Sequence, residues 1–165
     1  MVDPHDGPPL ESRPPGVADL VALCRALNRE HARYIVIGGM AIIQAGFVRA
    51  TEDIDLLVEA SAENLARLRR ALDDLPDHAV REMADDDLDR YVVVRVADEI
   101  VVDLMKAACG ITFGEGKDLV DVVSIDDVAI PFAKPMLLWR TRQTVREKDR
   151  QDRTFLARLL DKSEG

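Results

Sequence analysis

The residues best suited to chemistry are two aspartates, Asp53 and Asp55, which flank the apolar Ile54. In a β-strand successive side chains point to opposite faces, so both carboxylates share one face while Ile54 points into the core. At a separation of about 4 Å, two such charges repel by about 4 kcal/mol at an effective dielectric constant of about 20. A divalent cation removes this repulsion, and Mg²⁺ is typically held by one or two carboxylates and substrate phosphates. The pair therefore predicts a site for Mg²⁺ or Mn²⁺.

A glycine pair, Gly38-Gly39, precedes the aspartates at the end of a short apolar run. Because glycine has no side chain, its backbone can approach a phosphate closely, and the N-terminus of a following helix favours anions. An ordinary tight turn would also explain the glycines taken alone. Together with the aspartates, they predict a site for a metal ion and a phosphate.

A third aspartate, Asp103, lies in the middle of the apolar run Val101-Val102-Asp103-Leu104-Met105. A buried aspartate is costly unless it is paired or binds a metal. If this strand lies beside residues 53–58, Asp103 completes a cluster of three carboxylates, which suits two metal ions and could accept a proton from a hydroxyl. The alternative is an ion pair between Asp103 and Arg95.

This pattern resembles the nucleotidyltransferase superfamily, the minimal polymerase-beta-like fold, over roughly residues 20–160. The residues that carry the resemblance are the glycine pair, the motif Asp53-Ile54-Asp55-Leu56 about a dozen residues later, and a later strand aspartate. The tail resembles the AbiEii-type branch, whose members include toxins of toxin–antitoxin pairs. It contains Lys134 and the run Arg146-Glu147-Lys148-Asp149-Arg150-Gln151-Asp152.

The resemblance implies roles for individual residues. The expected metal ligands, which also carry the catalysis, are Asp53, Asp55 and Asp103, the last as a ligand or as the base. The expected nucleotide-binding residues are Gly38, Gly39, Thr51, Lys134, Lys148 and Asp149. Thr51 has a turn hydroxyl as its alternative interpretation, and Arg49 is interpreted as a surface arginine, with a phosphate contact as the alternative. Met40 departs from the superfamily, which often has serine or threonine after the glycines.

The expected activity is transfer of a nucleoside monophosphate from a nucleoside triphosphate (NTP) to an acceptor hydroxyl. RNA, such as a tRNA end, is the first choice of acceptor and protein the second, and the tail implies a toxin with an antitoxin protein as partner. One alternative is an enzyme that modifies an aminoglycoside or lincosamide antibiotic, with Asp85–Asp89 attracting the cationic drug. Another is a non-catalytic binding module with the same fold.

Apolar spacing and turn residues predict the elements that position these side chains: a small mixed β-sheet flanked by helices in one α/β domain. The helices are expected at residues 17–31, 39–45, 61–72, 135–144 and 149–160. Strands are expected at 34–37, 53–58, near 79–81, at 91–97 and 100–105 as a hairpin, and once within 120–130, with a loop at 111–116. Residues 1–16, which contain five prolines, are expected to form a disordered or extended arm before a single domain at 17–165.

Charge is unevenly distributed along the 165 residues, whose net charge is −9. Residues 134–165 carry nine basic and five acidic side chains, against 13 and 26 before them. These basic C-terminal helices could provide a positive surface for a polyanion, which the acidic remainder of the chain lacks. A solvated helix face with internal ion pairs would also explain the basic residues. No apolar run is long enough to span a bilayer and no signal peptide is recognised, so the cytoplasm is the expected location. Cys24 is expected to be a small buried hydrophobe.

Overall fold

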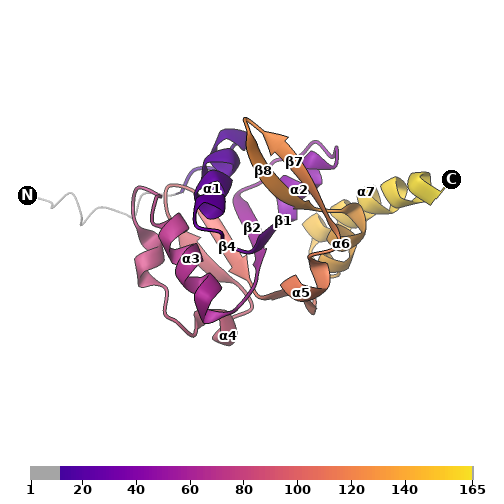
Figure 1. Cartoon of the computed structure of the whole chain (residues 1–165). Coiled ribbons are helices and arrows are strands. Elements are labelled where there is room, and N and C mark those ends of the chain that lie inside the picture. The colour runs from indigo at the N-terminus through magenta and orange to yellow at the C-terminus, as the bar shows by residue number, and fades with distance from the viewer. Residues whose placement is uncertain (1–11, 165) are drawn as a thin grey trace, which may run out of the picture.

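The structure is a computed structural model that describes residues 12–164, built around one six-stranded mixed β-sheet (Figure 1). The strand order is β3-β4-β2-β1-β8-β7. The strands are β1 (Tyr34–Ile37), β2 (Asp53–Val58), β3 (Val94–Ala97), β4 (Val101–Met105), β7 (Val120–Ile125) and β8 (Val128–Ala133). The prediction of a mixed sheet with helices in an α/β fold is confirmed.

Two parallel pairings bring distant parts of the chain together in the middle of the sheet. Strand β2 runs parallel to β4 and antiparallel to β1, and β1 runs parallel to β8. The outer strands join as antiparallel hairpins, β3 with β4 and β7 with β8. All four residues of β1 are buried, as expected for a central strand with both faces covered.

The helices are α1 (Val17–Arg29), α2 (Gly38–Gln44), α3 (Ala62–Leu72), α4 (Asp87–Arg90), α5 (Phe113–Gly116), α6 (Pro135–Thr141) and α7 (Glu147–Glu164), with a 3₁₀ helix at Ala79–Glu82. Helices α1 and α3 pack on each other, whereas α2 and α7 both contact α6. In Figure 1, α7 extends away from the sheet at the opposite side of the molecule from α3. A small hairpin of β5 (Ala107–Ala108) and β6 (Ile111–Thr112) follows β4.

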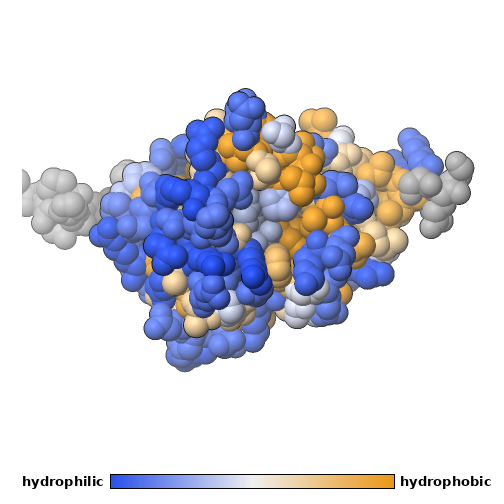
Figure 2. Space-filling model, viewed as in Figure 1, coloured by the Kyte–Doolittle hydropathy of each residue, from blue (hydrophilic) through white to orange (hydrophobic). Residues whose placement is uncertain are grey.

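Apolar residues of the helices and the sheet form one core, and the predicted helix faces fit it. Leu65, Leu68 and Leu72 of α3 are buried, and Ser61 caps that helix by accepting a hydrogen bond from the backbone of Asn64. Cys24 is fully buried, as predicted. Figure 2 shows hydrophilic residues over the side of α3, and hydrophobic ones gathered nearer to β7 and β8.

Three local predictions were wrong. The strand expected near residues 79–81 is the 3₁₀ helix, because the Asp98 carboxylate accepts hydrogen bonds from the backbone of Asp77 and Ala79 and bends the chain. The single strand expected within 120–130 is the β7–β8 hairpin, whose turn places Asp126 and Asp127 at positive φ. The loop expected at 111–116 contains β6 and α5, which a capping box at its first turn stabilises.

The predicted N-terminal arm lies mostly outside the described residues, which begin at Ser12. Residues 12–16 form no helix or strand and run against the turn between β3 and β4. Ser12 donates a hydrogen bond to the Asp98 carbonyl at 2.6 Å, and the Arg13 amide donates one to the Glu99 carbonyl at 3.0 Å. Between residues 12 and 164 no helix combines the length and the apolarity that crossing a bilayer requires.

Candidate metal and nucleotide site

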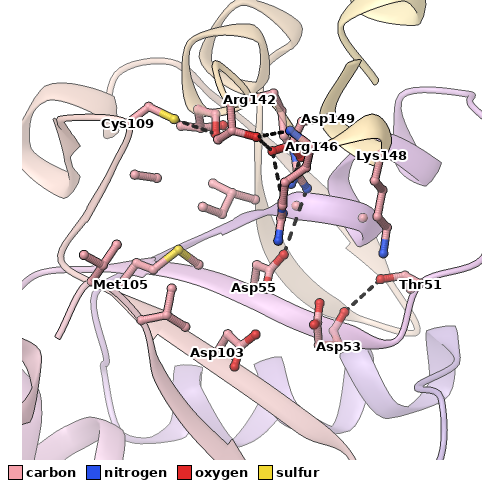
Figure 3. Close-up of a pocket in the computed structure, with 18 of the residues that line it drawn as sticks. Thr51, Asp53, Asp55, Asp103, Met105, Cys109, Arg142, Arg146, Lys148 and Asp149 are labelled. Carbon is pink, nitrogen blue, oxygen red and sulfur yellow. Dashed lines mark hydrogen bonds and ion pairs between the residues drawn. The ribbon is translucent and has the colours of Figure 1, made fainter. Parts of the chain in front are cut away.

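The three aspartates predicted to act together converge on one point. Asp55 of β2 lies beside Asp103 of β4 in the parallel register, and Asp53 shares their face because it precedes Asp55 by two residues. One oxygen from each carboxylate lies within 4.8 Å of the other two. The expected clustering of these residues, here called the aspartate triad, is confirmed, and Figure 3 shows it on the floor of a pocket.

The pocket is a cleft of about 810 Å³ between the sheet and the start of α7. It brings together most of the predicted site residues: Gly38, Gly39, Thr51, Asp53, Asp55, Asp103, Lys148 and Asp149. Lys134 is not among the lining residues; it precedes α6, and its amine lies 4.0 Å from Asp121 on β7. Met40 does not line the cleft either, because its side chain is buried in the core.

The glycine pair lets two polar side chains approach the start of α2. Gly38 has a φ of +69°, and a Cβ atom there would lie 2.0 Å from Oδ2 of Asp55. At Gly39 a Cβ atom would lie 2.4 Å from the Thr51 hydroxyl. Any side chain larger than hydrogen would collide with Asp55 or Thr51, so this close packing explains why both positions are glycine.

Thr51 is a turn hydroxyl, as its alternative interpretation held, and it also lines the cleft. Its hydroxyl donates a hydrogen bond to the Asp53 carbonyl at 3.0 Å, which fixes the turn leading into β2. Thr51 also lines the cleft, so its hydroxyl lies next to the glycine pair. The structure thus places a hydroxyl group at the bend although Met40 supplies none.

Asp55 is the carboxylate of the triad whose ionised form is disfavoured by burial and by its acidic neighbours. Burial, followed by the charge of Asp53, raises the pKa of Asp55 to about 7. Asp103 acts in the same direction, whereas Arg142, whose guanidinium lies 4.0 Å from Asp55, acts against it. A pKa this high means that the ionised triad is costly without additional positive charge.

One arginine on the neighbouring hairpin lies against the triad. Arg95 of β3 pairs with Asp103 through Nε and Nη2, each 3.0 Å from a carboxylate oxygen. Its Nη2 also lies 3.4 Å from Oδ2 of Asp53. The alternative interpretation of Asp103 as an ion-pair partner of Arg95 is therefore correct, and the clustering interpretation is correct at the same time.

A second group of charges lies on the other side of the cleft and is buried; we call it the α7 charge cluster (Arg49, Arg142, Asp149 and Asp152). Arg49 pairs with Asp152 at 3.0 Å, and Arg142 pairs with Asp149 at 3.0 Å. The two aspartate side chains are at most 1% exposed and the two arginine side chains at most 10%. The interpretation of Arg49 as a surface arginine was wrong, because its guanidinium fixes α7 to the loop before β2.

Asp149 is held ionised inside this cluster. Burial alone would raise the pKa of Asp149, but a hydrogen bond from the Thr144 hydroxyl and the charges of Arg142 and Arg146 together lower it. Sequence reasoning identified Asp149 but missed Asp152 and Arg142. The available signal was the three-residue spacing of Asp149 and Asp152, which puts both on the same helix face as the buried Leu156.

The donor set of the triad suits a hard divalent cation. Carboxylate oxygens are the ligands that Mg²⁺ and Mn²⁺ prefer, and the three lie close enough to share an ion. The raised pKa of Asp55 is the sign expected of an acidic cluster that a cation would stabilise. The residues therefore fit a metal ion, which would be held mainly by Asp53 and Asp55 at the open side of the triad.

Basic side chains at the cleft come from the tail of the chain. Lys148 and Arg146 line the cleft, and Figure 3 shows both side chains directed from the start of α7 toward strand β2. Both residues are exposed, and Arg146 also lies 3.4 Å from the Asp149 carboxylate, so Lys148 is the more accessible positive charge for a ligand. Comparison with known proteins gives no family assignment: no protein-family model matches the chain, and a search of curated proteins finds no significant match.

Proposed function

We propose that this protein is a metal-dependent nucleotidyltransferase, which moves a nucleoside monophosphate from an NTP to an acceptor hydroxyl. One observation carries the proposal: three carboxylates from two neighbouring strands meet within 4.8 Å in a cleft that also contains a glycine bend and exposed basic residues. A metal-bound triphosphate needs carboxylates for the metal ion and basic side chains for the phosphates, and the cleft contains both.

The reaction needs little covalent chemistry from the protein. The acceptor oxygen bonds to the α-phosphorus, the bond from that phosphorus to the β-bridging oxygen breaks, and pyrophosphate leaves with the electron pair. The acceptor proton passes to a carboxylate of the cleft or to water. Lys148 and Arg146 would hold the triphosphate against the glycine bend, with Thr51 beside it, and a bound Mg²⁺ or Mn²⁺ would neutralise phosphate charge.

The basic side chains that line the cleft outside the triad suit an anionic acceptor, and RNA is the proposed one. Outside the triad, the charged lining residues are the basic Arg49, Arg95, Arg142, Arg146 and Lys148 and the acidic Glu52 and Asp149. The acidic stretch that was expected to attract a cationic antibiotic does not line the cleft. Asp85 pairs instead with Arg69, and Asp89 with Lys106. The roles as a toxin and as an antitoxin partner stay predictions of the tail motif.

The test is label transfer from each of the four NTPs, with Mg²⁺ or Mn²⁺, to total RNA, to protein and to an aminoglycoside in parallel reactions. We expect label in RNA with the wild-type protein and none with Asp53→Asn. The matched control is Asp118→Asn, since Asp118 is an exposed aspartate outside the cleft.

The outcomes separate the candidate functions. Label in protein or drug alone would reject the RNA acceptor and keep the transferase. A folded wild-type protein that binds none of the four NTPs in calorimetric titrations, with or without metal, would leave the non-catalytic module as the explanation.

A further inference from the structure

Arg95 has an unusual position for a residue next to a metal site. It lies directly opposite Asp103 in the antiparallel β3–β4 hairpin, so both side chains leave the sheet on the same face. The guanidinium meets the carboxylate as a fork, with both oxygens of Asp103 engaged at 3.0 Å. Planar guanidinium and carboxylate groups match in this geometry, which makes the pair stronger than a single contact.

The other two carboxylates of the triad, Asp53 and Asp55, have weaker contacts with arginines than Asp103 has. Arg95 reaches Asp53 at only 3.4 Å and with one nitrogen. Asp55 has Arg142 at 4.0 Å, but that guanidinium also pairs with Asp149 at 3.0 Å and is shared with the α7 charge cluster. The oxygens of Asp53 and Asp55 that face the cleft are therefore open to a cation, whereas those of Asp103 are taken.

We propose that Arg95 occupies the place of the second metal ion, so that the site binds one divalent cation on Asp53 and Asp55. This rests on the proposed function, which brings the metal to the triad. The charges support it: three carboxylates are balanced by one guanidinium and one divalent cation, whereas a second divalent cation would leave an excess of two positive charges. A guanidinium stays charged at every physiological pH, so the positive charge that Arg95 contributes does not depend on ion concentration.

The assignment changes the role of Asp103. Both oxygens of this carboxylate accept hydrogen bonds from the guanidinium of Arg95, so neither is free to bind a metal ion. Asp103 therefore positions Arg95 and does not ligate a metal, although the resemblance implied that it would. The side chain of Arg95 is 59% exposed at the cleft, so its outer face is open to the substrate.

Metal stoichiometry tests this directly and needs no activity. Mn²⁺ is titrated into the protein without nucleotide, and the free ion is measured by electron paramagnetic resonance. We expect one tightly bound Mn²⁺ per chain in the wild type and in Arg95→Lys, which keeps the charge. Arg95→Ala frees Asp103 and should bind two. The double variant Arg95→Ala with Asp103→Asn should return to one.

Each other result is informative. Two ions in the wild type, or one in Arg95→Ala, would overturn the proposal about Arg95 while keeping a metal-binding triad. No Mn²⁺ bound to the folded wild type, with no change in Asp53→Asn, would instead remove the metal site from the proposed function. If Arg95→Ala does not fold, Arg95→Gln is the replacement, because it keeps most of the side chain and loses the charge.

Discussion

The aspartate triad and the α7 charge cluster both hold carboxylates beside arginines, but their charges are balanced differently. In the α7 charge cluster two buried aspartates meet two buried arginines, and Asp149 is held ionised. In the aspartate triad three carboxylates share Arg95 and part of Arg142, and the pKa of Asp55 rises to about 7. The first group is complete without a ligand, whereas the second is short of positive charge. We infer that one is structural and the other is built to bind a cation.

Removing a charge from the α7 charge cluster should have the largest effect on the stability of the fold. Asp152→Asn leaves the buried Arg49 without its counter-ion and removes one of the two buried carboxylates around Arg142, which we expect to lower the free energy of unfolding by about 3–5 kcal/mol. Urea denaturation followed by circular dichroism measures this. Asp161→Asn is the control on the exposed face of α7 and should change stability by no more than about 0.5 kcal/mol. Equal stability of the two variants would show that the α7 charge cluster contributes nothing to the fold.

The next test concerns the glycine that packs against the triad. Gly38 and Gly110 both have positive φ, but a Cβ atom at Gly38 would meet Asp55, whereas at Gly110 no atom lies within 4 Å. Gly110→Ala should therefore cost only the backbone penalty of about 1–2 kcal/mol. Gly38→Ala should cost roughly 1–3 kcal/mol more because of the overlap. Thermal melts of both variants measure the difference, and similar melting temperatures would contradict the close packing.

The charge deficit of the triad predicts an effect of pH on stability. The folded pKa of Asp55, about 7, lies above its usual value of 3.8, so the folded protein binds more protons between these values. Its contribution to stability is therefore present at low pH and is lost as the pH rises toward 7 and above. Asp55→Asn removes this dependence. Without metal, we expect the variant to be more stable than the wild type at pH 8 by about 1 kcal/mol or more, and the gap to shrink at pH 5.

Thermal melts at several pH values, without and with Mg²⁺, check this prediction. Mg²⁺ should raise the melting temperature of the wild type at pH 8 and leave that of Asp55→Asn unchanged. A constant gap between the two proteins from pH 5 to pH 8 would count against a raised pKa at this position.

The smallest expected effect is on NTP binding, and it distinguishes Lys148 from Lys134, two lysines to which the tail motif gives similar roles. Lys148 lines the cleft and Lys134 does not. Lys148→Ala should weaken NTP binding about tenfold, which corresponds to about 1.4 kcal/mol, because one exposed charge contributes modestly to phosphate binding. Lys134→Ala is the comparison, measured by the same calorimetric titration. An equal loss in both would support the role that the resemblance gives to Lys134.

Sequence reasoning found the triad because its signal is local. Alternation in residues 53–58 gives the shared face of Asp53 and Asp55, and an aspartate within an apolar strand indicates a buried partner. The α7 charge cluster was missed because Arg49 and Asp152 are 103 positions apart and nothing near Arg49 predicts its burial. The β7–β8 hairpin was missed because its turn uses Asp126 and Asp127 where glycine or asparagine is the usual signal.

The 103 positions between Arg49 and Asp152 also mean that their ion pair forms late during synthesis of the protein. When the ribosome has released β2 and β4, the three aspartates can already assemble, but the wall that faces them has not been made. That wall closes only after Asp149 and Asp152 emerge and bind Arg142 and Arg49. A nascent chain therefore completes this cleft late, when α7 docks.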